Sequence, residues 1–188
     1  MATISRDSPC LFITSVVHDR LPVFRTDALK RIVCAALDEA RHSGGFAIFA
    51  YVIMSDHFHL ITEGTLKPSD TLRLVNGIAS HRVISYLKEK NYATSLAKLK
   101  DAKKARGHVY SLWDGHSDVL PLFSERFFMQ RVNYIHRNPV QAGLVDRAED
   151  YHWSSVRCWN RRPLEDEPLL MDLDMIVWRR PRRRADEA

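Results

Sequence analysis

The chain has 188 residues, of which 45% are hydrophobic and 27% are charged. These values predict one globular domain with a full hydrophobic core and give no sign of a second domain. Five of the 28 basic residues are arginines within residues 179–188, and residues 1–178 carry 23 basic and 21 acidic groups. This larger part of the chain is nearly neutral, so charge alone does not identify a nucleic-acid partner.

Cysteine usage and hydropathy predict the compartment. Cys10, Cys34 and Cys158 are far apart, show no CxxC spacing and accompany no secretory leader, which is typical of a reducing cytoplasm. The longest apolar run, residues 46–54, is too short to cross a bilayer. We therefore expect a soluble cytoplasmic protein that does not enter the membrane.

The first elements along the chain are a strand and an amphipathic helix. Residues 11–17 form a compact apolar and β-branched run, which predicts a strand. A helix is expected to begin at Thr26-Asp27 and to end at Ser43-Gly44-Gly45. Between these signals, apolar residues recur three and four positions apart, at Leu29, Ile32, Val33, Ala36, Leu37 and Ala40.

Residues 46–54 and 57–62 read as a hairpin that turns at Ser55-Asp56. Side chains of a strand alternate between faces, so His57 and His59 share one face while Phe58 points into the core. Two imidazoles on one strand indicate a metal site, although two solvent-facing histidines give the same pattern.

A second helix over residues 69–87, capped by Ser69 or Asp70, begins the second half of a split βαβ pattern. The basic stretch 88–106 fits either a solvated surface or a nucleic-acid contact. The fourth strand is predicted to come from Trp113, His116 and residues 119–122. The predicted fold class is α+β: a ferredoxin-like split βαβ sandwich, with an antiparallel sheet and helices on one face.

A third helix is expected to open at Ser124 and to end before Pro139. Gln130, Tyr134 and Asn138 are spaced four apart and so share one face of it. His136 projects away from Tyr134 and is expected on the surface or facing DNA.

Three later features complete the chain. Tyr151, Trp153 and Trp159 alternate with arginines; such aromatics either stack on bases or, more often, pack a C-terminal segment onto its domain. We predict a domain over residues 1–160 and a basic, flexible tail over 161–188, whose arginines can add salt-sensitive affinity for phosphates.

Together these residues resemble the REP-associated tyrosine transposases, a branch of the single-tyrosine HUH transposases of insertion sequences. The resemblance runs from about Leu11 to Trp159 and joins three motifs in order. The motifs are Tyr51-Val-Ile-Met-Ser-Asp-His57-Phe-His59-Leu-Ile, Val132-Asn-Tyr134-Ile-His-Arg-Asn138-Pro139-Val-Gln-Ala-Gly143-Leu-Val and Asp150-Tyr-His-Trp153-Ser-Ser155.

The resemblance implies an HUH endonuclease fold that cuts and rejoins single-stranded hairpin DNA. In that family a tyrosine attacks the DNA, which carries over to Tyr134, and a divalent metal is held by residues matching His57, His59 and Asn138. It further implies Mg²⁺ or Mn²⁺ as the metal, a monomer or homodimer, and a nucleoid-associated location.

The sequence departs from the family before the first histidine, where Ser55-Asp56 replaces the usual Pro-Asn or Pro-Asp and is expected to fix the turn less firmly. Two other functions stay open. One is a hairpin-DNA-binding protein or repressor derived from a transposase that no longer cuts. The other is a metal-dependent hydrolase whose histidines activate water.

Overall fold

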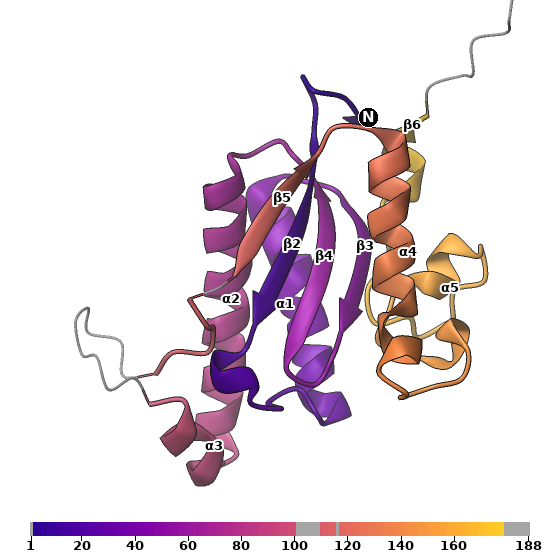
Figure 1. Ribbon diagram of the computed structural model, residues 1–188. Coiled ribbons are helices and arrows are strands. Elements are labelled where there is room, and N and C mark those ends of the chain that lie inside the picture. Colours follow the sequence, from indigo (N-terminus) through magenta and orange to yellow (C-terminus); the bar gives the residue numbers. More distant parts are fainter. Residues whose placement is uncertain (1, 101–109, 116, 179–188) are drawn as a thin grey trace, which may run out of the picture.

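A four-stranded antiparallel sheet with the order β3-β4-β2-β5 lies at the centre of the protein, which the computed structural model describes over residues 2–100, 110–115 and 117–178 (Figure 1). The strands are β2 (Cys10–Val16), β3 (Ile48–Ile53), β4 (His57–Glu63) and β5 (Asp118–Leu122). Helix α1 (Asp27–Gly44) joins β2 to β3, and α2 (Pro68–Glu89) lies between β4 and β5. This order and the antiparallel pairing of β2 with both β4 and β5 confirm the predicted ferredoxin-like fold.

Local signals fix the ends of the helices. Thr26 Oγ1 accepts a hydrogen bond from the Leu29 N–H, and α1 ends at Gly45 with φ of 62°, as predicted. Helix α2 begins one residue before the predicted cap, because Pro68 occupies its first turn, where the missing N–H has no cost. The short helix α3 (Ala93–Lys98) follows α2; residues 101–109 of the basic stretch, and His116, lie outside the described residues.

The two faces of the sheet are covered differently. Helices α1 and α2 pack against one face, where Ser15 donates a hydrogen bond of 2.6 Å to Asn76 of α2. Helix α4 (Glu125–Gln141) lies along the opposite face beside β3, where the rings of Phe49 and Phe128 are 6.0 Å apart (Figure 1). The predicted layer of helices on one face is thus formed by α1 and α2, and α4 adds a helix on the other.

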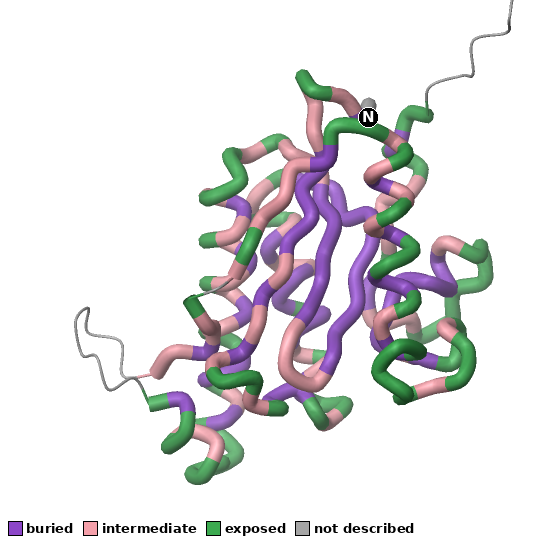
Figure 2. Tube along the Cα trace, in the orientation of Figure 1, coloured by how far each residue is buried: buried purple, intermediate pink, exposed green. Residues whose placement is uncertain are grey.

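The core is deepest along β3 and β4, whose inner residues are buried (Figure 2). Phe58 is fully buried between the sheet and Trp113, with ring centroids 5.4 Å apart, as the strand alternation predicts. Burial therefore fixes the register of β4, and with it the face on which its histidines lie.

Helix α4 passes through Pro139 and ends at Gln141, so the prediction that Pro139 terminates it was wrong. The proline removes one backbone donor, but Ala142 N–H still donates to the Asn138 carbonyl and Leu144 N–H to the Pro139 carbonyl. The buried Pro139 ring is retained in the last turn, and the chain leaves the helix at Gly143, with φ of 67°.

Residues 151–155 run beside β3 and cover its outer edge. The Ile53 N–H donates to the Trp153 carbonyl at 2.9 Å, and the Ser155 N–H donates to the Tyr51 carbonyl at 3.0 Å. The Tyr151 hydroxyl donates to the Ile53 carbonyl at 2.7 Å. The Trp159 Nε1–H also donates to the Phe49 carbonyl and the Trp153 Nε1–H to Asp27 Oδ1, so the three aromatics pack a C-terminal segment onto the domain. The backbone of this segment protects an edge strand from pairing with other chains.

The packed structure extends beyond residue 160, the boundary predicted for the domain. Arg157 of α5 (Val156–Trp159) pairs with Glu167, and Asp172 accepts a hydrogen bond from the Ile48 N–H at 2.8 Å. The short turn η2 (Ala148–Asp150) precedes α5. After Asp172 the chain passes the short turn η3 (Leu173–Met175) and pairs β6 (Ile176–Val177) with β1 (Ala2–Thr3). The arginine-rich end, residues 179–188, lies outside the described residues.

Within the described part of the chain, every helix is too short or too polar to cross a membrane.

Candidate functional site

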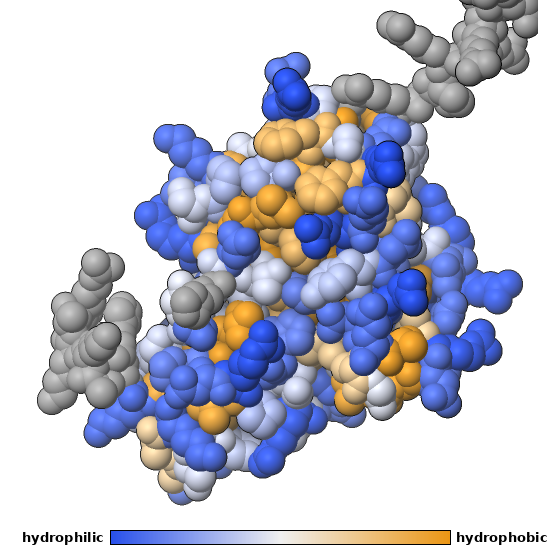
Figure 3. Space-filling view, in the orientation of Figure 1, coloured by the Kyte–Doolittle hydropathy of each residue, from blue (hydrophilic) through white to orange (hydrophobic). Residues whose placement is uncertain are grey.

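The face of the sheet that carries α4 contains an open cavity of about 420 Å³. Figure 3 shows this face, with apolar side chains over β5 and the start of α4 next to hydrophilic ones. The cavity is lined by Phe12, Thr14, Val16, Arg20, His57, His59, Arg131, Tyr134 and Asn138. All four residues predicted for the site therefore meet in one place.

The turn before His57 is held by the backbone. The Val17 N–H donates to the Asp56 carbonyl and the Phe24 N–H to the Ser55 carbonyl, both at 2.8 Å, and the Met54 N–H closes the turn onto the His57 carbonyl. These bonds from neighbouring segments hold a turn that contains no proline.

His57 is oriented by its neighbour in the chain. Nδ1 of His57 lies 2.6 Å from Asp56 Oδ1, and Asp56 Oδ2 accepts a hydrogen bond from Arg20 at 3.1 Å. Burial by itself raises the pKa of Asp56, but the hydrogen bonds and charges of His57 and Arg20 outweigh it, and the pKa is lowered. A carboxylate on Nδ1 fixes the tautomer that leaves the Nε2 lone pair as a ligand.

His59 is nearly buried, with 4% of its surface exposed. Thr14 Oγ1 lies 2.9 Å from its Nδ1, whereas its buried Nε2 has no hydrogen-bond partner among the described residues. Burial, helped by the charges of His57 and Arg131, lowers the pKa of His59 to about 3, so the ring is neutral at ordinary pH. An unpaired buried nitrogen is costly unless it binds something, and a neutral imidazole is suited to a metal.

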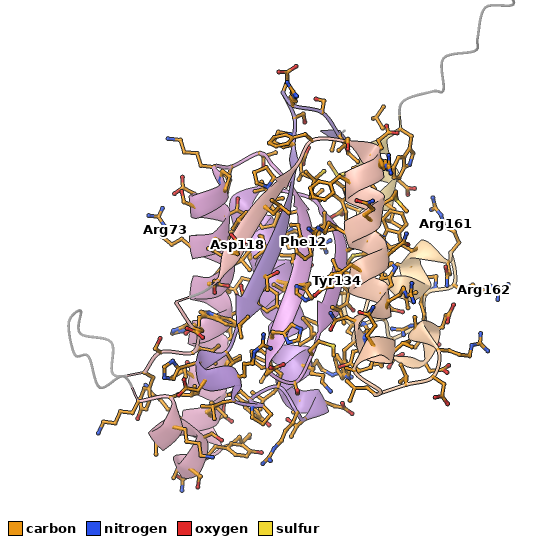
Figure 4. The ribbon with its side chains drawn as sticks, viewed as in Figure 1. Phe12, Arg73, Asp118, Tyr134, Arg161 and Arg162 are labelled. Atoms are coloured by element: carbon orange, nitrogen blue, oxygen red, sulfur yellow. The ribbon has the colours of Figure 1, made fainter. Side chains whose placement is uncertain are left out.

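Tyr134 reaches the same cavity from α4. Its ring centroid is 5.1 Å from that of His59 and 6.1 Å from that of Phe12, and the side chain is 39% exposed. Figure 4 shows Tyr134 extending from α4 over the sheet toward Phe12. Asn138, one turn further along α4, lines the same cavity because residues four apart share a helix face.

The residues present fit a divalent metal. His57 and His59 have ring centroids 4.9 Å apart, each has a partner on Nδ1, and Asn138 supplies an amide oxygen. No cluster of three or more His, Cys, Asp or Glu with metal-binding geometry occurs within the described ranges. Two nitrogens and one amide oxygen leave coordination positions for water or phosphate, an arrangement compatible with Mg²⁺ or Mn²⁺.

The prediction for His136 was wrong. It is 8% exposed, and its Nε2 lies 3.0 Å from Ser155 Oγ. The side of α4 turned away from Tyr134 faces the C-terminal segment rather than solvent, and burial lowers the pKa of His136 to about 4. Gln130 is exposed and is not among the residues that line the cavity.

Sequence reasoning missed four polar residues that line or support the site. Asp56 had a local signal, since an acidic residue precedes a His-x-His pair. Arg131 is three residues before Tyr134 and seven before Asn138, which is also a helical spacing. Thr14 and Arg20 come from β2 and the turn η1 (His18–Arg20), and only the register of β2 against β4 brings Thr14 opposite His59.

No protein-family model and no curated protein matches the sequence. Among solved structures, a REP-associated tyrosine transposase bound to a REP hairpin is similar, with a TM-score of 0.60 at 19% identity. The alignment covers 88% of this chain and 87% of that one. A protein from Deinococcus radiodurans R1, provisionally named a transposase, aligns with a TM-score of 0.43 at 21% identity over 69% of this chain and 90% of that one.

The first of these alignments covers most of both chains. The resemblance noted in the sequence is thereby confirmed at the level of the fold. The chain has the fold of a REP-associated tyrosine transposase.

Proposed function

We propose that the protein is a transposase-like endonuclease and strand transferase for single-stranded DNA, with Tyr134 as its nucleophile. The observation that carries this proposal is the position of the Tyr134 ring against His59, whose buried Nε2 has no hydrogen-bond partner among the described residues, in a cavity that His57 and Asn138 also line. The fold shared with a hairpin-bound tyrosine transposase supports hairpin-flanked DNA as the substrate.

The reaction exchanges one phosphodiester bond for another. The Tyr134 oxygen forms a bond to phosphorus as the bond from phosphorus to the 3′ oxygen breaks; the phenol proton passes to solvent and the 3′ oxygen takes one up. A divalent metal bound by His57, His59 and Asn138 would make the phosphorus more electrophilic. The 5′-phosphotyrosine retains the bond energy, so the released 3′ hydroxyl, or another one, can reverse the step without ATP.

Single-stranded hairpins from the protein's own genomic neighbourhood, labelled and incubated with Mg²⁺, Mn²⁺ or EDTA, test this on a denaturing gel. We expect a labelled band that migrates with the protein, requires metal and disappears in Tyr134→Phe. Tyr92→Phe is the matched control, because Tyr92 is also 39% exposed but lies outside the cavity. Its adduct should equal that of the unmodified protein.

The other two functions give different results in the same assay. Cleavage that leaves no adduct and survives Tyr134→Phe indicates the metal-dependent hydrolase. Tight hairpin binding without cleavage indicates the binding protein or repressor. Either result contradicts Tyr134 as a nucleophile.

A further inference from the structure

Arg131 lines the cavity but has no part in the chemistry described above. It lies on α4 three residues before Tyr134 and therefore on the same side of the helix. The mechanism already assigns Tyr134 to phosphorus and three residues to a metal. No residue has yet been assigned to the non-bridging oxygens of the bound phosphate.

Two aromatic rings hold the Arg131 guanidinium. Its central carbon lies 5.1 Å from the centre of the Phe12 ring and 5.2 Å from that of Phe127. A cation over an aromatic ring is attracted to it, and the contact leaves the N–H groups at the edge of the guanidinium available to acceptors. The rings therefore position the charge without occupying all of its donors.

The guanidinium is also short of acceptors. Its Nε is buried without a hydrogen-bond partner, and no carboxylate forms an ion pair with Arg131 in the described part of the chain. Arg20, the other arginine of the cavity, is paired with Asp56. Arg131 thus supplies the cavity's uncompensated positive charge, and a buried donor without an acceptor is costly until an anion arrives.

We propose that Arg131 is a further catalytic residue, whose guanidinium binds a non-bridging oxygen of the scissile phosphate. This rests on the proposed function. When Tyr134 attacks, negative charge builds on the non-bridging oxygens, and a fixed guanidinium stabilises that charge more than the charge of the ground state. Phe12 and Phe127 act as positioning residues, since they touch the arginine and not the reacting atoms.

The test compares Arg131→Gln and Arg131→Lys on two substrates. One hairpin oligonucleotide has an ordinary phosphodiester at the cleavage site mapped with the unmodified protein, and the other has an uncharged methylphosphonate there. Arg126→Gln is the matched control, because Arg126 is an exposed arginine of α4 outside the cavity. Thermal unfolding of each variant verifies that it is folded.

We expect Arg131→Gln to slow single-turnover adduct formation on the phosphodiester about 100-fold at saturating DNA. Arg131→Lys should recover part of the rate, and Arg126→Gln should stay within about twofold of the unmodified protein. On the methylphosphonate, the difference between Arg131→Gln and the unmodified protein should shrink to a few-fold. An equal loss on both substrates indicates a packing role for Arg131 and overturns the proposal, as does an unchanged rate.

A binding measurement separates this proposal from the proposed function. In the Tyr134→Phe background, methylphosphonates are placed one at a time along the single-stranded segment, and hairpin affinity is measured by fluorescence anisotropy. One position should weaken binding about tenfold, and Arg131→Gln should remove that sensitivity. If the unmodified protein forms no adduct, the proposed nuclease fails, yet this sensitivity still supports the phosphate contact. Sensitivity that persists in Arg131→Gln, or no binding at all, overturns it.

Discussion

At the scale of residues, the two histidines are held by different partners. A carboxylate contacts Nδ1 of His57, whereas a hydroxyl contacts Nδ1 of His59. The carboxylate is itself fixed by Arg20, which makes Asp56 the centre of a short charged chain. Such partners orient ligating histidines and raise their basicity.

Asp56→Asn should therefore lower the affinity for Mn²⁺ about 10- to 100-fold while the protein stays folded. The amide keeps the size of the side chain but removes the charge that favours a donating His57 Nδ1–H. Calorimetric titration of Mn²⁺ into the DNA-free protein measures the change. Asp70→Asn on α2 is the control, since the Asp70 side chain is 44% exposed, pairs with Arg73 and lies outside the cavity. Equal affinities for Asp56→Asn and the unmodified protein would show that the pair does not orient a ligand.

At the scale of elements, α4 is fixed between the sheet and the C-terminal segment. On one side Phe128 packs against Phe49 of β3, and on the other His136 contacts Ser155. Ser155 in turn contacts the backbone of Tyr51, so β3, α4 and the C-terminal segment share one hydrogen-bonded junction. The position of Tyr134 relative to β4 depends on this junction.

The C-terminal segment is itself held by a buried ion pair. Only 8% of the Arg157 side chain and 1% of the Glu167 side chain are exposed, and Arg157 also donates to the carbonyls of Tyr151 and His152. Glu167→Ala should lower the free energy of unfolding by about 3–5 kcal/mol, because it leaves a buried guanidinium without its counter-charge.

Denaturant unfolding measures this loss, with the exposed Glu165→Ala as the control. A change below about 1 kcal/mol, the range of surface ion pairs, would contradict the role assigned to the pair.

The sequence predicted the order and type of the central elements because their signals are local. Thr26 and Ser124 cap their helices as expected, and the alternation around Phe58 placed both histidines on one face. Two predictions failed where distant contacts decide the outcome. His136 was expected on the surface, but it is buried and contacts Ser155. Helix α4 was expected to end before Pro139, but it continues through this buried residue.

At the scale of the whole molecule, residues 161–178 belong to the packed domain. Leu169 and Ile176 are buried, and Asp172 joins the start of β3. No periodic pattern predicts this segment, and the partners of Asp172, which are Arg41 and the backbone of Ile48, lie more than 100 residues earlier in the chain. The domain boundary was therefore predicted at residue 160. Of the residues that line the cavity, His57, His59, Tyr134 and Asn138 were named from the sequence, but their meeting depended on the packing of α4 on the sheet.

Truncation after Trp178 separates the basic end from the domain. Removing residues 179–188 should leave the melting temperature and adduct formation unchanged but flatten the salt dependence of hairpin binding. For each DNA phosphate that the arginines no longer neutralise, the slope of log affinity against log salt becomes shallower by about 0.7 for single strands. Affinity measured across a salt series tests this. If the slope of log affinity against log salt equals that of the full chain, these arginines do not contact DNA.

The contact between Tyr134 and His59 lies within a single chain, so one copy contains the proposed nucleophile and the proposed metal ligands together. One phenol can hold one strand end. Under the proposed chemistry, a copy that has cut once is occupied until a 3′ hydroxyl releases it, and the burst of adduct cannot exceed one per chain. The supply of acceptor ends, rather than the speed of cutting, then decides whether the DNA is restored or rearranged.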